Sequence, residues 1–405
     1  MKNKICIITS GALPVPDVKG GAIERLMTML AEENEKYGLL DITILGVYDE
    51  QAVAVQQKFS KTKFVNLLPK ECKYNIVRSW EGKIRWHVRE HFGYDIHFRN
   101  TYPSLVDSYI KKEGNKFDLF VSEGYDYEAL VTASKLYGKD KVCWHLHMNP
   151  PFNPRIDKIY GKCVAVSEYI INKYRLQTSN SKENTAVIFN GIDTAIFQQE
   201  VSKEERHQLR KSLGINDEDF VLVFCGRLVK VKGVKELIEA VLKCQNNKIK
   251  LLIIGSSNFG NGDEGSYPIE VKKIVQEHSD QIKFTGYIDN KDIYKYHKIA
   301  DVGVIPSTYN DPCPLSMFEM ITSGLPTIAT AAGGMTEIGN ADCTIFVHLD
   351  NIVDELSRAI NTLANNPQKN FDMHVAALKR SDVFAKDRFY NDFCKTINVF
   401  INENL

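Results

Sequence analysis

Residues 220–243, FVLVFCGRLVKVKGVKELIEAVLK, show an apolar run of strand length followed by a helical segment, an alternation that continues along this chain. The run FVLVFC is apolar on both faces, as expected of a strand buried in a parallel sheet. Arg227, Lys230 and Lys232 follow the strand, and Gly233 then opens a segment with helical period. Cations at the end of a strand, beside the N-terminus of a helix, suit a phosphate or diphosphate. Taken alone, the same charges also fit a solvated turn.

The alternation of short apolar runs and helical segments continues along the chain. The expected strands are KICIITS, DITILGVY, FDLFVSEG, KVCWHLH, KCVAVSE and TAVIFNG in the first half, and FVLVFCGR, IKLLIIGS, QIKFTGY, DVGVIPS and PTIATA in the second. Between them lie helical segments such as GGAIERLMTMLAEENEKYG and GVKELIEAVLKCQN. The pattern predicts an α/β fold of two doubly wound, Rossmann-like domains, with a ligand cleft at the carboxyl ends of their strands.

Length and composition agree with two soluble domains. The 405 residues exceed what one ordinary core holds, and a polar stretch near residues 196–204 predicts domains at 1–198 and 199–380. The last segment, 381–405, is expected to form an amphipathic helix. The 51 basic and 51 acidic residues cancel, which disfavours a nucleic-acid binder. No apolar run reaches the roughly 20 residues that cross a bilayer.

Nine cysteines are scattered along the chain without a CxxC pair, and several lie inside expected strands. They are predicted to be reduced core thiols of a cytosolic protein. The opening MKNKICIITSGALPVPD has an apolar run too short for a signal peptide, so it is interpreted as the first strand.

A second candidate anion site lies in NDPCPLSMFEM, residues 310–320. Pro314 fixes where a helix begins, so the N–H groups of Leu315 and Ser316 lack intrahelical partners and favour an anion. The acids Asp311 and Glu319 stand on either side of this start. An ordinary helix N-terminus is the simpler interpretation of the prolines.

These motifs together resemble those of a known family. In order, GRLVKVKG, FTGYIDNKDIYKYHKIADVGVIPS and DPCPLSMFEMITSGLPTIATAAGGMTEIG resemble the donor-binding half of a retaining GT-B glycosyltransferase of family 4, the glycosyl transferases group 1. GGAIERLMTMLA, VAVSEYI and VIFNGIDTAIF extend the resemblance into the first half. It implies an N-terminal acceptor-binding domain, a C-terminal nucleotide-sugar-binding domain and a final helix that packs back on the N-terminal domain.

The resemblance implies that four residues hold the phosphates of the donor. Arg227 and Lys232 would neutralise the diphosphate, Arg227 through a planar fork and Lys232 as a point charge. The backbone N–H groups of Leu315 and Ser316 would hold the distal phosphate, at the helix start that Pro314 fixes.

Other residues would bind the remaining parts of the donor. By resemblance, Glu319 is the second acid of the family's E-x7-E motif and accepts hydrogen bonds from the ribose hydroxyls. Asp311 takes the place of the first acid, near the donor sugar. The family's acid-Gly-Phe-Gly is Asp-Pro-Cys-Pro here, which leaves the contact made by Asp311 open. Tyr287 and Ile288 would meet the nucleobase through their main chain.

In the first domain, Gly20 and Gly21 would let a loop approach the phosphates closely. WHLHMNP places His145 and His147 on the same face of a strand end. Family members carry a histidine near here that faces the donor sugar, and His147 is favoured because it lies nearer to the loop. A buried histidine bonded to a carbonyl is the alternative.

The implied activity is transfer of a sugar from a nucleotide-diphosphate sugar, with retention, to a glycan or lipid-linked acceptor in cell-surface polysaccharide biosynthesis. A UDP-sugar is expected, with GDP- and dTDP-sugars as alternatives. No Asp-x-Asp metal motif is present, so a metal-independent reaction without a cofactor is expected. The alternatives are a nucleotide-sugar epimerase or hydrolase on the same fold, and a non-catalytic carbohydrate-binding or coat protein.

Residues 58–99 hold ten Lys or Arg against four acids, together with Trp80 and Trp86. Basic and aromatic residues together suit an anionic membrane surface or a lipid-diphosphate acceptor, so a cytoplasmic protein on the inner face of the membrane is one interpretation. A solvated insertion is the other. HVREH, residues 87–91, matches a helical zinc pattern, but no third ligand is evident and no metal site is predicted.

Overall fold

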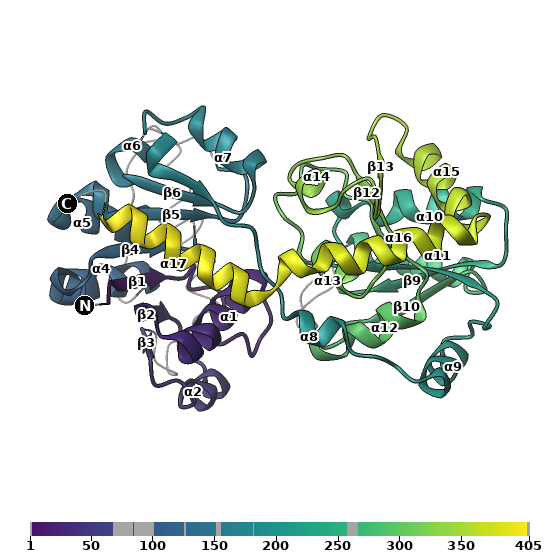
Figure 1. The fold of residues 1–405 in the computed structure, drawn as a ribbon, viewed down its shortest axis with the longest axis horizontal. Coiled ribbons are helices and arrows are strands. Elements are labelled where there is room, and N and C mark those ends of the chain that lie inside the picture. Colours follow the sequence, from purple (N-terminus) through teal and green to yellow (C-terminus); the bar gives the residue numbers. More distant parts are fainter. Residues whose placement is uncertain are drawn as a thin grey trace. The chain divides into compact units, whose positions relative to one another are not determined.

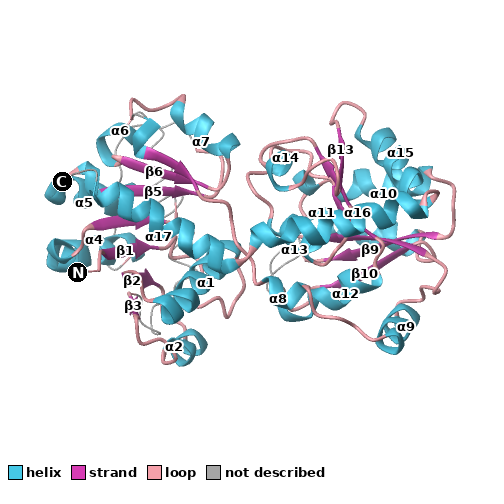
Figure 2. Ribbon diagram, in the orientation of Figure 1, coloured by secondary structure: helices cyan, strands magenta, loops and turns pink. Residues whose placement is uncertain are grey.

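A computed structural model describes residues 2–67, 84, 101–124, 127–150, 155–180, 182–256 and 266–402. The chain forms two compact units. Unit 1 comprises Met1–Phe189 and Phe389–Leu405, and unit 2 comprises Asn190–Arg388. In each unit, helices cover both faces of one sheet (Figures 1 and 2).

Unit 1 contains a seven-stranded sheet in the order β3-β2-β1-β4-β5-β6-β7, and all its described strand pairs are parallel. The strands are β1 (Lys4–Ile8), β2 (Asp41–Gly46), β3 (Thr62–Asn66), β4 (Leu119–Ser122), β5 (Val142–Leu146), β6 (Lys162–Ala165) and β7 (Thr185–Val187). The helices are α1 (Ala22–Tyr37), α2 (Glu50–Gln56), α4 (Tyr102–Glu113), α5 (Tyr127–Tyr137), α6 (Ile156–Ile159), α7 (Glu168–Arg175) and most of α17 (Lys386–Asn402). The order reverses between β1 and β4, so the topological switch point lies there.

The alternation of side chains along β1 separates the two cores of unit 1. Ile5 and Ile7 are fully buried in the core that includes α1 and α17. Cys6 and Ile8 point to the opposite face and pack with residues of α4, α5 and α7. Both faces of the central strands are therefore apolar, which is the reason these strands form continuous apolar runs in the sequence.

Helix α17 returns the end of the chain to unit 1, as the resemblance implies. Phe389, Tyr390 and Phe393 are fully buried in the same core as residues of α1. Figure 1 shows α17 beside α1 in this unit. The Tyr390 hydroxyl donates to Oδ1 of Asn34 at 2.7 Å and accepts from the backbone N–H of Leu39 at 3.0 Å. These bonds join the last helix to the end of α1.

Unit 2 contains a six-stranded sheet in the order β10-β9-β8-β11-β12-β13, again with parallel pairs. The strands are β8 (Phe220–Cys225), β9 (Ile249–Ile254), β10 (Ile282–Gly286), β11 (Val302–Ile305), β12 (Thr327–Thr330) and β13 (Thr344–Val347). The helices are α8 (Thr194–Phe197), α9 (Lys203–Ser212), α10 (Val234–Lys243), α11 (Ser266–Glu277), α12 (Ile293–Ile299), α13 (Leu315–Thr322), α14 (Met335–Ile338), α15 (Ile352–Ala364) and α16 (Pro367–Arg380). Here the switch point lies between β8 and β11.

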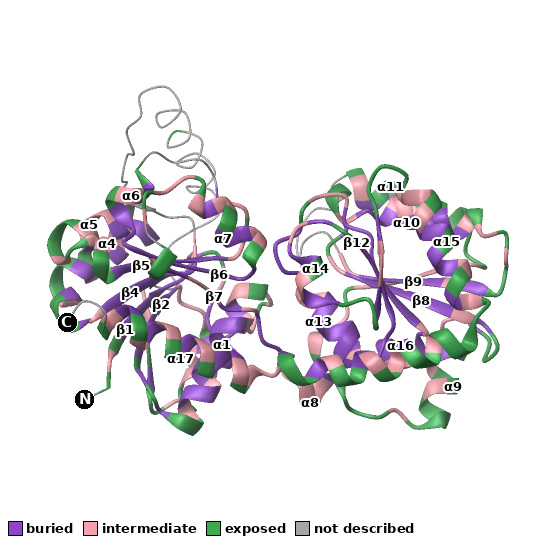
Figure 3. Cartoon of the chain, turned by 45° about the horizontal axis from the view of Figure 1, so that its top comes forward, coloured by how far each residue is buried: buried purple, intermediate pink, exposed green. Residues whose placement is uncertain are grey.

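The predicted fold class of two doubly wound units is confirmed, and every expected strand is present. Two further strands, β3 and β13, were missed. Both lie at a sheet edge. β3 (TKFVN) has polar residues at both ends, and the apolar part of β13 (TIFV) is short. Figure 3 shows that the central strands, such as β4, β5, β8 and β9, are largely buried.

The described cysteines and helices are also informative. The eight cysteines placed by the structure are free, and all but Cys244 are buried, as the sequence predicts for core thiols. Among the described helices, none has the length and apolar character that crossing a membrane requires.

Candidate active site

The candidate donor site of unit 2 lies on the loops that follow β8 and β11, the two strands at its switch point. Ligands of open α/β sheets bind at this position. The first loop leads through a short 3-10 turn, Lys230–Lys232, into α10. The second leads through residues 306–314 into α13. Two motifs that are about 80 residues apart in the sequence thus meet, as the parallel pairing of β8 with β11 requires.

Gly233 allows the two loops to touch. Its φ is +71°, and a Cβ atom at this position would lie 1.8 Å from the carbonyl oxygen of Pro306. The backbone N–H of Thr308 donates to the carbonyl of Val231 at 2.9 Å. Only glycine fits at position 233, because both the dihedral angle and the space exclude a side chain.

Lys232 and Asp311 form an ion pair across these loops. Lys232 Nζ lies 2.5 Å from Asp311 Oδ2, and both side chains are largely buried. The same Nζ lies 5.3 Å from the centre of the Tyr309 ring. Burial and the carboxylate of Asp311 raise the pKa of Tyr309, so its hydroxyl stays protonated at neutral pH. The sequence predicted both charged residues in the site, but it did not predict that they pair.

The glycine-rich turn after β12 fixes the backbone of Asp311. A Cβ at Gly333 would lie 2.2 Å from the carbonyl oxygen of Asp311, and the N–H of Gly334 donates to that oxygen at 2.8 Å. The contact with Gly334 therefore fixes the backbone of Asp311, and the ion pair with Lys232 fixes its side chain.

Helix α13 begins where the sequence predicts. Pro314 is its N-cap in an extended conformation, so Leu315 and Ser316 form the first turn, where N–H groups have no intrahelical acceptor. Glu319 lies one turn further along and is 5% exposed. Before the helix, the carbonyl of Cys313 accepts a hydrogen bond from Asn190 at 3.2 Å.

The other predicted donor-binding residues of unit 2 lie at neighbouring strand ends. Arg227 follows β8 and is exposed, and Tyr287 and Ile288 follow β10. Tyr287 is 47% exposed. Gly255, after β9, packs so closely on Gly226 that a Cβ would lie 1.9 Å from its carbonyl oxygen. All the candidate residues of unit 2 therefore lie at the carboxyl edge of one sheet.

In unit 1, the loop after β1 carries Gly20 and Gly21. Both have positive φ values, +78° and +104°, and Gly21 is the N-cap of α1. A Cβ at Gly21 would lie 2.1 Å from a carboxylate oxygen of Glu24. Burial raises the pKa of Glu24 to about 7, and the charges of Asp17 and Glu123 act in the same direction.

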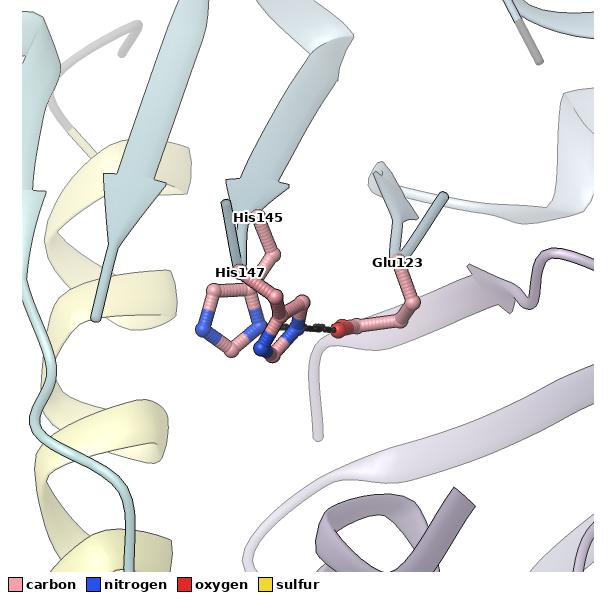
Figure 4. A group of neighbouring side chains, drawn as sticks. All are labelled: Glu123, His145 and His147. Carbon is pink, nitrogen blue, oxygen red and sulfur yellow. Dashed lines mark hydrogen bonds and ion pairs between the residues drawn. The ribbon is translucent and has the colours of Figure 1, made fainter. Parts of the chain in front are cut away.

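Glu123 follows β4 and bridges two histidines of β5 and its loop (Figure 4). His145 Nδ1 lies 3.0 Å from Oε2 of Glu123, and His147 Nε2 lies 2.6 Å from the same oxygen. The side chains of Glu123 and His145 are fully buried, whereas that of His147 is 8% exposed. Burial by itself would raise the pKa of Glu123, but the two histidines hold it at about 2.

Sequence reasoning identified both histidines but missed Glu123. Its position could have identified it, because Glu123 directly follows a predicted strand at the switch point. Acidic residues are rarely buried for packing alone, so an acid at this position is a candidate site residue. Among the described residues, these three form the one group whose potential ligating atoms lie within 4.8 Å of each other. The zinc-like HVREH segment and most of residues 58–99 lie outside the described residues.

The sequence and structure of the chain match known glycosyltransferases. Residues 205–380 match the family described as Glycosyl transferases group 1. Spore coat protein SA of Bacillus subtilis (strain 168) is 26% identical over 344 residues, covering 83% of this chain and 82% of that protein. The putative glycosyltransferase YtcC of the same organism is 26% identical over 93% of this chain and 88% of its own length.

Solved structures show the same fold. The structure of Anabaena Alr3699/HepE in complex with UDP is 20% identical, has a TM-score of 0.71, and is matched over 98% of this chain and 100% of that chain. A glycosyltransferase from Rickettsia africae ESF-5 is 18% identical with a TM-score of 0.75 over the full length of both chains. The two-unit α/β architecture is therefore that of the GT-B proteins.

Proposed function

We propose that this chain, whose residues 205–380 match the glycosyl transferases group 1, transfers a sugar from a nucleotide-diphosphate sugar to a glycan or lipid-linked acceptor, with retention. The proposal rests chiefly on the switch point of unit 2. There the chain brings Lys232, Asp311 and the start of α13 onto adjoining loops. A cation beside unpaired N–H groups suits a diphosphate, and a neighbouring carboxylate suits sugar hydroxyls.

In the proposed reaction, Arg227 and Lys232 bind the diphosphate and stabilise the charge that grows on it as the glycosidic bond breaks. The first-turn N–H groups of α13 add to this stabilisation. These groups supply positive charge of the kind that a divalent metal supplies elsewhere, so the proposed transfer is metal-independent. The acceptor attacks the face from which the nucleotide leaves, which retains the configuration.

We propose a UDP-sugar as the donor, with GDP- and dTDP-sugars as alternatives, because the HepE structure holds UDP. Surface-polysaccharide synthesis is supported by a further relative, the putative teichuronic acid biosynthesis glycosyltransferase TuaC of Bacillus subtilis, 25% identical over 59% of this chain. Glu319 is proposed to bind the ribose hydroxyls and Asp311 the sugar, while Tyr287 and Ile288 meet the base through their main chain.

Calorimetry with UDP and with uridine tests the donor site. Arg227→Ala is expected to weaken UDP binding about tenfold or more, because a charged hydrogen bond contributes about 1.5–3 kcal/mol, and to leave uridine binding unchanged. Lys211→Ala is the control, since Lys211 is an exposed cation on α9 of the same unit, outside the candidate site. Equal losses of affinity for UDP in the two variants, or no UDP binding by the parent protein, would contradict the proposed site.

A screen of nucleotide sugars by thermal shift would identify the donor, because a bound ligand stabilises the folded state. Transfer is then assayed with and without acceptor. Release of free nucleotide or of an altered sugar without acceptor would indicate a hydrolase or epimerase. Activity that EDTA abolishes and manganese restores would refute a metal-independent reaction, and an inverted anomeric product would refute retention.

A further inference from the structure

The geometry at the end of β4 and β5 is that of a carboxylate that accepts two hydrogen bonds. His145 Nδ1 lies 3.1 Å from Oε1 and 3.0 Å from Oε2 of Glu123, and His147 Nε2 lies 2.6 Å from Oε2 (Figure 4). Burial of Glu123 excludes water as a competing donor. A carboxylate of such low pKa carries no proton at neutral pH and is an acceptor only. The ring nitrogen that faces it must therefore carry the hydrogen in each histidine.

A metal ion would give different distances. Two ligands at about 2.0–2.1 Å from a tetrahedral metal lie roughly 3.3 Å from each other. The 2.6 Å between His147 Nε2 and Glu123 Oε2 is too short for that arrangement and is normal for a charge-assisted hydrogen bond. In this structure, hydrogen bonds therefore hold the cluster together.

The other nitrogen of each ring follows from this assignment. Burial and the neighbouring His145 lower the pKa of His147, against the effect of Glu123, so His147 is neutral at pH 7. A neutral imidazole with hydrogen on Nε2 has a bare lone pair on Nδ1. The Nε2 atom of His145 is buried with no partner among the described residues, which is acceptable for a bare nitrogen but costly for an N–H group.

We propose that Glu123 is a positioning residue, which fixes His147 in the Nε2–H tautomer so that Nδ1 of His147 accepts a hydrogen bond from a sugar hydroxyl. The sugar as ligand rests on the proposed function, whereas the tautomer does not. His147 suits this task because it is the one member of the cluster with an exposed part, while His145 is enclosed against Phe393 of α17. His145 then completes the support of Glu123 from within the core.

Nuclear magnetic resonance of the full chain with 15N-labelled histidine tests the tautomer directly. Long-range 1H–15N spectra distinguish a protonated from a bare ring nitrogen, and His147→Gln assigns the signals. We expect hydrogen on Nε2 of His147 and on Nδ1 of His145 in the parent protein. In Glu123→Gln, the amide donates as well as accepts, so at least one of these histidines should change tautomer or become a mixture.

Ser323→Ala is the matched control. It removes the hydroxyl that lies 2.9 Å from Nδ1 of another buried histidine, His297 in unit 2, and should alter only the signals of His297. Glu123→Leu provides a second variant that cannot hydrogen-bond at all. Unchanged tautomers of both histidines in every Glu123 variant that folds would overturn the proposal. So would hydrogen on Nδ1 of His147 in the parent protein.

Two further measurements separate this inference from its rivals. Stoichiometric zinc chloride should leave the signals of His147 unchanged, and zinc that stays bound through gel filtration and shifts them would instead identify a metal site. Once a donor is known, Glu123→Gln should lower kcat about tenfold with little change in the KM for the donor. Loss of donor affinity with unchanged kcat would overturn the positioning role. If the parent shows no transfer, the proposed function fails while the tautomer is still decided by the spectra.

Discussion

Several glycine contacts join the loops at the switch point of unit 2, whereas unit 1 combines one such contact, Gly124 against the backbone of Ser10, with a buried side-chain network. In unit 2, Gly233, Gly255 and Gly333 each bring one loop against the carbonyl oxygen of another. In unit 1, Glu123 bridges two histidines from the next strand. Both sets of loops lie at the topological switch point of their sheet. Backbone contacts predominate in unit 2, and hydrogen bonds between buried side chains predominate in unit 1.

This difference affects which substitutions each set of loops tolerates and how easily its residues are recognised in the sequence. A backbone contact at glycine leaves the neighbouring side chains available for a ligand. It also requires glycine at that position, and glycine is easily recognised in a sequence. A buried side-chain network requires that every member stays paired, because an unpaired buried charge is costly. Its members need no recognisable spacing.

The largest expected effect on stability comes from a substitution that breaks the backbone contact at Gly233 in unit 2. Gly233→Ala should lower the free energy of unfolding by about 4 kcal/mol, because the new Cβ meets a backbone carbonyl that cannot move aside and φ is positive. Gly286→Ala is the control, since its φ is +75° but nothing lies within 4 Å, and it should lose only about 1 kcal/mol. Urea denaturation measures both variants. Equal losses would show that the loop contact contributes nothing.

The next effect tests the acids of unit 1. The folded pKa of Glu24, about 7, lies above its usual 4.5, so the folded state binds the proton more tightly than the unfolded state. Stability should therefore fall as pH rises from about 4.5 to 7, by about 3 kcal/mol. Glu24→Gln should remove this dependence, whereas Glu183→Gln, an exposed control in the same unit, should keep it. Denaturation at several pH values decides between these outcomes.

Glu123 sharpens the comparison because its pKa is shifted in the opposite direction. The stabilisation of the folded state by ionised Glu123 is present above pH 4.5 and is lost as pH falls toward about 2. Glu123→Gln should therefore reduce the loss of stability on acidification below pH 4.5, while leaving the fall between pH 4.5 and 7 in place. An identical acid profile in the parent and the variant would contradict the pairing with the histidines.

A smaller effect is expected at Glu319 of unit 2. If its carboxylate binds the ribose, Glu319→Gln should weaken binding of both uridine and UDP by about 2 kcal/mol. Arg227→Ala should affect UDP alone, so calorimetry with the two ligands separates the two roles. Glu239→Gln, an exposed change on α10, is the control. Parent-like affinity for uridine in Glu319→Gln would exclude contact with the ribose.

The smallest effect is expected at Tyr309. Its hydroxyl lies 3.5 Å from Lys232 Nζ, at the limit of a hydrogen bond, while its ring lies below the ammonium group. Tyr309→Phe keeps the ring and should cost about 1 kcal/mol or less. Tyr309→Leu also removes the cation–π contact and should cost about 0.5–1 kcal/mol more. Thermal denaturation of both variants tests this order, and a larger loss for the phenylalanine variant would reverse it.

Most of the fold could be predicted because it depends on local pattern. Buried parallel strands are apolar on both faces and form recognisable runs, whereas the edge strands β3 and β13 each contain only a short apolar stretch. The start of α13 was predicted correctly because proline fixes its own φ and punctuates the chain. The pairing of Lys232 with Asp311 could not be predicted, since each residue had a plausible separate role.

The amino-acid sequence by itself determined the two doubly wound units and the start of α13. These features follow from periodicity and dihedral preference, which act within a few residues. The contacts of Gly233, Gly255 and Gly333 depend on the tertiary structure, because each glycine meets the loop of another strand. The tertiary structure decided which charges pair. The partners Lys232 and Asp311, like Glu123 and the two histidines, come from different strands. Only the parallel register brings their side chains within hydrogen-bonding distance, and burial then makes the pairing obligatory.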